Sequence, residues 1–480
     1  MYQHPTEHAN ATLGQYLQRV AWSSRLRGLL AGGSLLLLGG ALGFLATAFN
    51  PWYLLFGVVG LLTLAVVVLR PAWGVHILLA SVFLAGVLPV GGTVTDISVA
   101  DGVVVALALA TLMAFAAPRF QVGLPPALLL MGLYIVVGLL SAANSDAVDV
   151  AAPRLLRLAA YGVAAFSVFQ LFSKTVPWRS LLIFLILGAG LIAVDVLYTQ
   201  VVILSLVKDI STLNTNSVAF LFDLVIPVIV AYFLGRGRWL PGGWLWSVGL
   251  LLAADLATLS RGGYLGLACG LAVVFSLSSL RRGVKMIPIA LALGALVLFL
   301  VPSSIFDRVG DDRTFTHYRA YQWSAASDVF TNHPLLGIGF NNLAGVPVYT
   351  PFGTIYSPDP HNLVLRVAGE TGVVGLLVVG AIILATAWRM LRNYRALRDS
   401  DVPLALLNLG MLGGIVAYLV HALFDVFWVH NSGLLFWIYI GLTYATSSVI
   451  AHRTAATEIE SPLLPAEQRH PTGFSAEEGW

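Results

Sequence analysis

Charged residues are scarce in this sequence. Asp, Glu, Lys and Arg make up 10% of the 480 residues, whereas soluble domains carry about 25%. This scarcity excludes an ordinary soluble protein, and the net charge of +3 is too small to suggest a nucleic-acid-binding protein. The sequence has one cysteine, Cys269, so no internal disulfide is possible. It shows no internal repeat, and its polar start has no cleavable signal pattern.

The sequence contains many long runs of apolar residues. Hydrophobic residues make up 58% of the chain, and the mean hydropathy is +0.86. Because a membrane-spanning helix needs roughly 17–25 apolar residues, these runs predict an all-α polytopic membrane protein with about 12–14 transmembrane helices. Fourteen segments qualify, although several are short: 28–48, 52–69, 74–90, 99–117, 125–143, 153–172, 181–204, 216–234, 242–259, 262–280, 285–301, 363–387, 403–424 and 431–450.

The Lys and Arg residues predict the orientation of these helices, because inside loops of membrane proteins are enriched in them. With the N-terminus inside and alternating helices, 18 of the 26 Lys and Arg residues lie inside. Every short inside loop then carries a positive charge, which favours an even number of helices with both chain ends inside. The eight outside cations are Arg154, Arg157, Lys208, Arg261, Arg308, Arg313, Arg319 and Arg366.

This topology divides the chain into five segments. They are a cytoplasmic segment (1–27), a first set of transmembrane helices (28–301), one long external loop (302–360), a second set of transmembrane helices (361–450) and a disordered cytoplasmic tail (451–480). The loop contains a stretch with helical periodicity, which predicts an amphipathic helix over 313–330.

Arg319 lies in the middle of the apolar face of that expected helix. Aromatic residues such as Phe315, Trp323 and Phe330 share its face. Either the arginine snorkels, with its stem covering apolar surface, or it points into a polar cavity beneath the loop. The following stretch NHPLLGIGFNN predicts a turn at Gly337 and Gly339, whose backbone N–H groups could also approach an anion.

A second external arginine, Arg261, lies in the short hairpin between two expected helices. A cation at a helix N-terminus near the membrane surface favours an anion. The alternative is an interfacial arginine that meets lipid phosphates.

The stretch SPDPHNLVLRVAGETG brings titratable residues to the expected start of a membrane helix. Arg366 and Glu370 are four residues apart and can pair on one helix face. His361 lies at the outer end of the helix. Its imidazole could accept a proton near neutral pH; the alternative is that the residue is merely exposed. Asn362 sets the helix start with Pro360.

Four further acids lie within expected membrane helices, where ionisable residues usually have a function or a partner. The residues themselves give no role to Asp195, Asp223, Asp255 and Asp425. No Asp-x-Asp pair in the external loop suggests a metal, although the adjacent pair Asp311 and Asp312 keeps that question open.

Several of these stretches, in this order, resemble the O-antigen ligase and Wzy-type polymerase family. They are NTNSVAFLFDLVIP from Asn214, SRGGYLGL from Ser260, YRAYQW from Tyr318, HPLLGIGFNN from His333 and HNLVLRVAGETGVVGLL from His361. The resemblance covers about Asn214 to Val374; the N-terminal helices match only in being hydrophobic.

The resemblance implies an enzyme with a fold like the GT-C glycosyltransferases, in the bacterial inner membrane, with its active site on the periplasmic or outer side. Family members move glycan from an undecaprenyl pyrophosphate carrier to a hydroxyl, on lipid A–core for ligases or on another glycan for polymerases. They need no metal or other cofactor. By this resemblance, Arg261 and Arg319 bind the pyrophosphate and His361 is the essential histidine. From the residues themselves, we expect Asn362, Arg366 and Glu370 to support the helix start. Ligases usually have twelve helices, fewer than the fourteen segments found here.

The chemistry of the residues agrees with this interpretation. A planar arginine fork matches phosphate, and a base near the acceptor hydroxyl assists its attack. Two alternatives stay open: a Wzy-type O-antigen or exopolysaccharide polymerase, and a transporter of lipid-linked glycans. Transporters often carry repeats and polar sites at the membrane midplane, whereas the residues singled out here cluster outside.

Overall fold

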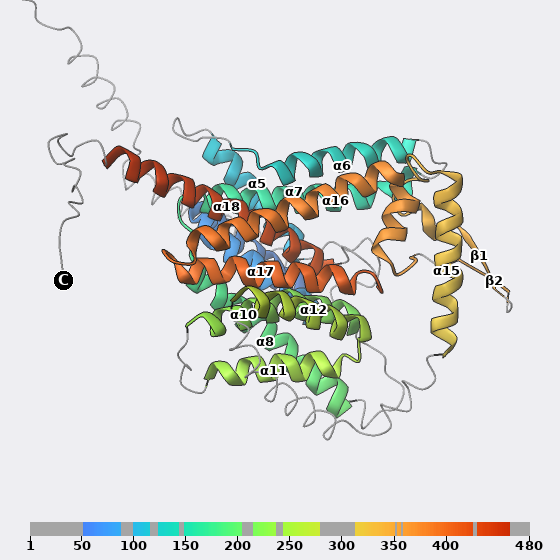
Figure 1. Cartoon of the computed structure of the whole chain (residues 1–480), viewed down its shortest axis with the longest axis horizontal. Coiled ribbons are helices and arrows are strands. Elements are labelled where there is room, and N and C mark those ends of the chain that lie inside the picture. Colours follow the sequence, from blue (N-terminus) through green and yellow to red (C-terminus); the bar gives the residue numbers. More distant parts are fainter. Residues whose placement is uncertain are drawn as a thin grey trace, which may run out of the picture. The chain divides into compact units, whose positions relative to one another are not determined.

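The computed structural model of the protein describes residues 51–87, 99–115, 123–143, 148–203, 215–236, 243–278, 313–350, 353–356, 359–425 and 430–460. These residues are almost entirely helical (Figure 1). The elements in order are α3 (Pro51–Leu69), α4 (Pro71–Val87), α5 (Val99–Phe115), α6 (Pro126–Ala143), α7 (Val148–Phe172), α8 (Trp178–Leu197), a π-helical turn η1 (Tyr198–Ile203), α10 (Thr215–Arg236), α11 (Gly243–Ala257), α12 (Arg261–Ser278), α15 (Arg313–Asn332), a 3₁₀ turn η2 (Asn342–Gly345), β1 (Pro347–Thr350), β2 (Gly353–Tyr356), α16 (Leu363–Leu397), α17 (Val402–His421) and α18 (His430–Glu460).

The prediction of an all-α polytopic membrane protein is confirmed. Among the described residues, eight helices are long and apolar enough to cross a membrane, and four more, in α3, α4, α5 and α11, are apolar but shorter. Twelve of the fourteen predicted segments coincide with helices. The other two, 28–48 and 285–301, lie outside the described residues.

The chain divides into two compact units, Met1–Ala65 and Val66–Trp480. The described residues of the first unit all belong to α3. The second unit contains the helical bundle and every residue discussed below.

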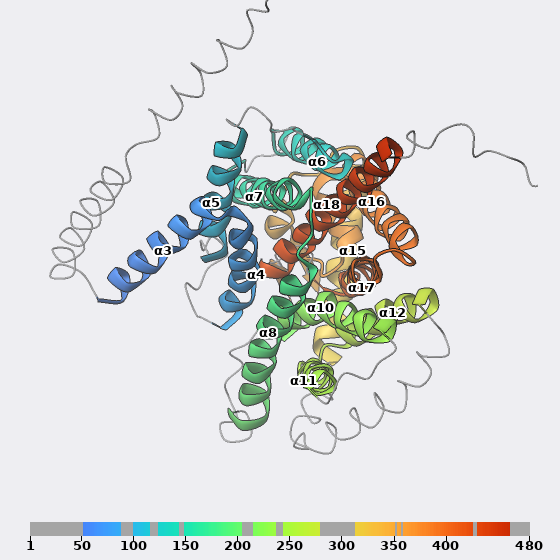
Figure 2. The same ribbon diagram turned by 90° about the vertical axis from the view of Figure 1, so that its left-hand side faces the viewer.

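Helix α17 lies in the middle of the bundle, in contact with α10, α12 and α16 (Figure 2). Its glycines allow this close approach. A Cβ atom at Gly414 would lie 2.6 Å from the carbonyl oxygen of Leu224 in α10, and one at Gly270 of α12 would lie 2.4 Å from that of Gly413. Small residues at such contacts let membrane helices pack backbone to backbone. The largest fully buried side chains include Trp437 of α18 and Tyr418 of α17.

Helix α15 stands across one end of this bundle (Figure 1), and we call this end the α15 end. Helix α15 includes the stretch 313–330, whose periodicity predicts an amphipathic helix. The segment after it contains η2 and then an antiparallel hairpin, β1 paired with β2, which the sequence analysis did not anticipate. The hairpin leads back to the start of α16.

The cations expected on opposite sides of the membrane lie at opposite ends of the bundle. Arg154 and Arg366, expected outside, contact residues at the α15 end. Arg453, expected inside, pairs with Asp401 at the start of α17, with 3.0 Å between Nη1 and Oδ2. These three positions agree with the predicted separation of the cations, while the topology and the side of the membrane that each end faces stay predictions.

Two helices extend further than hydropathy predicts. α16 continues ten residues past its expected end, to Leu397, and α18 continues to Glu460, into the segment predicted to be a disordered tail. That prediction is wrong for 451–460, because a helix can continue past its apolar part while its backbone hydrogen bonds remain internal. Residues 461–480 lie outside the described part of the chain.

Candidate functional site

Helix α16 is broken at Gly372. This glycine has φ 65° and ψ −164°, a conformation that residues with a Cβ rarely adopt. A Cβ atom here would also lie 2.2 Å from the carbonyl oxygen of Leu335. At the break, the N–H of Val373 donates to the carbonyl of Pro334 at 2.8 Å. The segment after α15 thus satisfies a backbone group that the interrupted helix leaves without a partner.

The same segment satisfies the carbonyl groups on the other side of the break. Ile338 N–H donates to the carbonyl of Gly369, and Gly339 N–H donates to that of Glu370, both at 2.9 Å. The hydroxyl of Ser141 in α6 also donates to the Glu370 carbonyl, at 2.7 Å. Irregular backbone at such a place must be paired within the protein. The glycine-rich turn therefore stabilises the broken helix, and its Gly339 N–H is engaged there instead of facing an anion.

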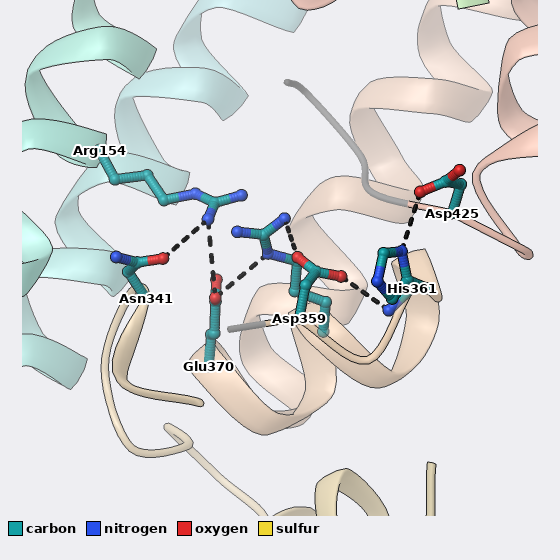
Figure 3. Close-up of polar contacts among 7 residues, drawn as sticks. Arg154, Asn341, Asp359, His361, Glu370 and Asp425 are labelled. Carbon is teal, nitrogen blue, oxygen red and sulfur yellow. Dashed lines mark hydrogen bonds and ion pairs between the residues drawn. The ribbon is translucent and has the colours of Figure 1, made fainter. Parts of the chain in front are cut away.

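A buried cluster of opposite charges surrounds the first part of α16 (Figure 3). Arg366 Nε donates to Glu370 Oε1 at 3.2 Å, and Arg366 also forms an ion pair with Asp359. Arg154 of α7 approaches the same Glu370 oxygen at 3.9 Å and donates to Asn341 Oδ1 at 3.4 Å. Only 5% of Arg366 and 2% of Glu370 are exposed. Charges buried this deeply require partners, so the cluster ties α7, α16 and the segment after α15 together.

Asp359 connects this cluster to His361. Its Oδ1 accepts a hydrogen bond from the His361 backbone N–H at 2.7 Å. His361 has φ 50°, in the left-handed region, which is strained for a residue with a Cβ. Burial raises the pKa of Asp359 to about 7, against the effects of the nearby Arg154 charge and the hydrogen bond from His361. Asn362 then begins α16 as its N-cap, since its Oδ1 accepts from Leu365 N–H at 3.0 Å.

The His361 side chain is paired with Asp425, which follows the end of α17. Nδ1 of His361 lies 2.9 Å from Asp425 Oδ1 (Figure 3). The side chain of His361 is 34% exposed and that of Asp425 only 8%. Because the carboxylate accepts the Nδ1 proton, Nε2 is left as the free acceptor of the ring. Nε2 has no hydrogen-bond partner among the described residues.

Arg319 lies on the side of α15 that faces the bundle. Trp323, one helical turn later, donates its indole N–H to the carbonyl of Pro360 at 2.8 Å, directly before His361. Arg319 is half-buried, and its charge acts on His421 at the end of α17. Of the two interpretations of this arginine, the contact of Trp323 on the same side of α15 and the influence of the Arg319 charge on His421 favour the one in which it points beneath α15.

Arg261 is exposed at the first residue of α12, directly after a three-residue connection from α11. The next residue, Gly262, packs against the end of α17: a Cβ atom there would lie 2.7 Å from His421 Cδ2 and 3.3 Å from Phe424 Cβ. Asp425 follows Phe424 in the chain. Arg261, Arg319 and His361 therefore all border the C-terminal end of α17.

Several residues of this site are not predicted from the sequence. The sequence gives Asp425 no role beyond that of a membrane acid, and it gives Arg154 none beyond that of an outside cation. No signal in the sequence marks Asp359 as a partner, although it lies two residues before His361. Among the described residues, no group of three or more His, Cys, Asp or Glu side chains could hold a metal ion. The pair Asp311 and Asp312 leaves open whether the external loop binds a metal, and both residues lie outside the described residues.

A comparison with protein families finds a similarity over the region that contains this site. Residues 246–380 match the family model described as O-antigen ligase. The match includes Arg261, Arg319 and His361, and it confirms the resemblance to the O-antigen ligase and Wzy-type family over this region. It supports a multi-pass membrane enzyme that transfers glycan. A search of curated proteins finds no match.

Proposed function

We propose that the protein transfers glycan from an undecaprenyl pyrophosphate carrier to an acceptor hydroxyl, at the periplasmic or outer side of the bacterial inner membrane. The observation that carries this proposal is the His361–Asp425 pair, whose free Nε2 lies at a bundle end bordered by two arginines. The family match supports glycan transfer in general. The donor, the acceptor and the residue roles are our proposal.

In the proposed reaction, Nε2 of His361 takes the proton of the acceptor hydroxyl. The hydroxyl oxygen forms the new bond to the anomeric carbon, while the bond from that carbon to the pyrophosphate oxygen breaks. The leaving pyrophosphate keeps the electron pair of that bond. Asp425 holds the proton of Nδ1 and stabilises the positive charge that develops on the ring. A positioned base of this kind contributes roughly 10²–10⁴-fold to the rate.

Arg261 and Arg319 stabilise the leaving pyrophosphate in this proposal. A guanidinium offers several donors in a planar fork and stays charged, so it matches the phosphate oxygens. Groups aimed at charge that develops in the transition state typically contribute about 3–4 kcal/mol each. Losing one arginine is therefore expected to harm the reaction as much as losing the base.

A transporter of lipid-linked glycans would not need this arrangement. The singled-out residues gather at one end of the bundle instead of its middle, and a histidine oriented by a carboxylate serves proton transfer better than passage of a lipid. Ligases and polymerases would use the same chemistry, so the product separates them: a single transfer onto a lipid-core acceptor indicates a ligase, and a ladder of repeat units on the carrier indicates a polymerase.

Purified protein with a polyprenyl pyrophosphate-linked glycan and an acceptor tests the proposal. Wild-type protein should release free polyprenyl pyrophosphate as glycan appears on the acceptor. His361→Ala should lose most turnover yet bind the donor, whereas Arg319→Lys should weaken both donor binding and turnover, because it keeps the charge but loses the fork.

Arg398→Lys is the matched control, since Arg398 is exposed and lies at the other end of α16. Each variant must first reach the membrane at normal levels. Near-normal transfer by folded His361→Ala would refute the role of this histidine as the base. Donor consumption without release of free polyprenyl pyrophosphate would refute the reaction itself.

A further inference from the structure

Three buried polar side chains form a chain directly beneath Arg261. Asp223 of α10 accepts from Nδ1 of His421 in α17, with 2.7 Å between Oδ2 and Nδ1. Nε2 of His421 lies 3.1 Å from the hydroxyl of Ser260, the residue before Arg261. All three residues are nearly inaccessible: 0% of Asp223, 1% of His421 and 4% of Ser260 are exposed. The proposed reaction gives none of them a role.

The surroundings of His421 fix the direction of these hydrogen bonds. Phe220 stacks on the imidazole, with ring centroids 3.8 Å apart, so the ring cannot turn freely. With Asp223 as the ionised carboxylate, which only accepts, Nδ1 of His421 carries the proton and Nε2 accepts one from the Ser260 hydroxyl. Three further charged residues influence this group of side chains electrostatically. Asp255 of α11 influences Asp223, and Arg319 and Asp425 influence His421.

Ser260 uses its oxygen a second time, as the N-cap of α12. The oxygen accepts a hydrogen bond from the Gly263 N–H at 3.3 Å. With its proton committed to His421, the hydroxyl presents its lone pairs to the first turn of α12. This is the turn that begins with Arg261.

The connection before Ser260 is strained and held by hydrogen bonds. Leu259 has φ 56°, in the left-handed region, which is costly for a leucine. Thr258 donates its hydroxyl to the carbonyl of Asp255 at 2.6 Å and accepts from Ser260 N–H at 3.3 Å. Strain of this kind persists only where the surrounding structure over-determines it. The first turn of α12 is thus held by the Ser260 cap and by the hydrogen-bonded connection that precedes it.

We infer that Asp223, His421 and Ser260 are positioning residues for Arg261, and that they set the direction from which this arginine meets the donor pyrophosphate. The inference rests on the proposed function, because it needs Arg261 to bind the donor. A buried chain that only filled space between helices would not need to end on the N-cap before the binding arginine. Small displacements of binding groups can change rates by about 10²-fold.

The test measures donor affinity, with binding of a polyprenyl pyrophosphate-linked glycan as readout, together with the KM for the acceptor. Ser260→Ala should weaken donor binding about tenfold and leave the acceptor KM unchanged. In protein that already carries Arg261→Ala, the same change should have no further effect on donor binding. Asp223→Asn keeps the shape of the side chain and should give the same pattern, which covers the case that Ser260→Ala does not fold.

The protein contains a matched control at another buried histidine. Ser180 lies 2.7 Å from Nε2 of His76, in a pair outside the proposed site. Ser180→Ala should therefore leave donor affinity unchanged. Ser260→Thr, which keeps the hydroxyl and the capping ability, should retain most of the affinity.

The outcomes separate this inference from the proposed function. If Arg261→Ala binds the donor normally, the pyrophosphate assignment of Arg261 is wrong and the positioning role falls with it. If Arg261→Ala binds weakly while Ser260→Ala and Asp223→Asn bind normally, only the positioning role is refuted. An equal loss from Ser260→Ala with and without Arg261 would also refute it, because the effect would then not act through the arginine.

Discussion

Replacement of Asp425 by asparagine tests the proposed base most directly. The change keeps the size of the side chain but removes the charge that accepts the Nδ1 proton of His361 at 2.9 Å. Asparagine can present its NH₂ group to Nδ1, and the proton then moves to Nε2, where it blocks the uptake of the acceptor proton. We therefore expect Asp425→Asn to lower kcat and to leave donor affinity nearly unchanged.

The size of the effect follows from the geometry of the pair. A hydrogen bond to a charged group contributes about 1.5–3 kcal/mol, and each 1.36 kcal/mol corresponds to a tenfold change in rate. This gives a loss of about 10- to 150-fold. Because 34% of the His361 side chain is exposed, water compensates part of the loss, and we expect a value near the lower end. The loss should stay smaller than that of His361→Ala.

The assay is kcat of purified protein at saturating donor and acceptor, after equal membrane levels have been shown. Asp195→Asn is the control, because Asp195 is a half-buried acid of α8 whose side chain has no ion pair or hydrogen bond among the described residues. Asp425→Asn combined with His361→Ala should be little worse than His361→Ala alone, since the two residues act as a unit. A kcat above half of the wild-type value for Asp425→Asn would refute the reasoning.

Three further predictions concern the fold, the orientation and metal dependence. Gly372→Ala should destabilise the folded protein by about 1–3 kcal/mol, because it adds strain at φ 65°; Gly380→Ala in the same helix, where a Cβ meets nothing within 4 Å, should cost far less in the same thermal unfolding measurement. After Cys269→Ser, a cysteine at Tyr349 should react with a membrane-impermeant thiol reagent in intact cells and one at Asp399 should not, since both positions are exposed but lie at opposite ends of the bundle; the reverse labelling would overturn the proposed orientation. Transfer activity should survive excess chelator, and loss of activity with rescue by magnesium would show that a divalent ion is required.

The membrane helices could be predicted because their signal is local. A chain in lipid must satisfy its backbone within each helix, so an apolar run of sufficient length nearly determines the element. The ends of the helices carry no such signal. α18 continues to Glu460 through polar residues that hydropathy scores as a loop. The break in α16 was also missed, because GETG lies within an otherwise continuous apolar run and reads as part of it.

The site could be predicted only as single residues, and its pairs could not. Cations and a histidine at helix starts are visible in the sequence because charge is rare there. Asp425, however, is 64 residues from His361, and Asp223 is 198 residues from His421. Such pairs depend on which helices become neighbours. Hydropathy does not specify this, because lipid-facing and buried apolar residues look alike in sequence.

The strained residues of the protein point to a site that is organised before any substrate binds. Among the described residues, three residues other than glycine have positive φ: Leu259, Asn341 and His361. Each is held by specific contacts, through the hydrogen-bonded turn before α12, the Arg154 guanidinium and the Asp359 carboxylate, respectively. A left-handed conformation costs roughly 1–2 kcal/mol for such residues, so all three together would be unexpected in positions chosen only for stability. Two of them, Leu259 and His361, lie at or beside the proposed base and the proposed phosphate-binding arginine, the groups whose placement would control the rate of the proposed transfer.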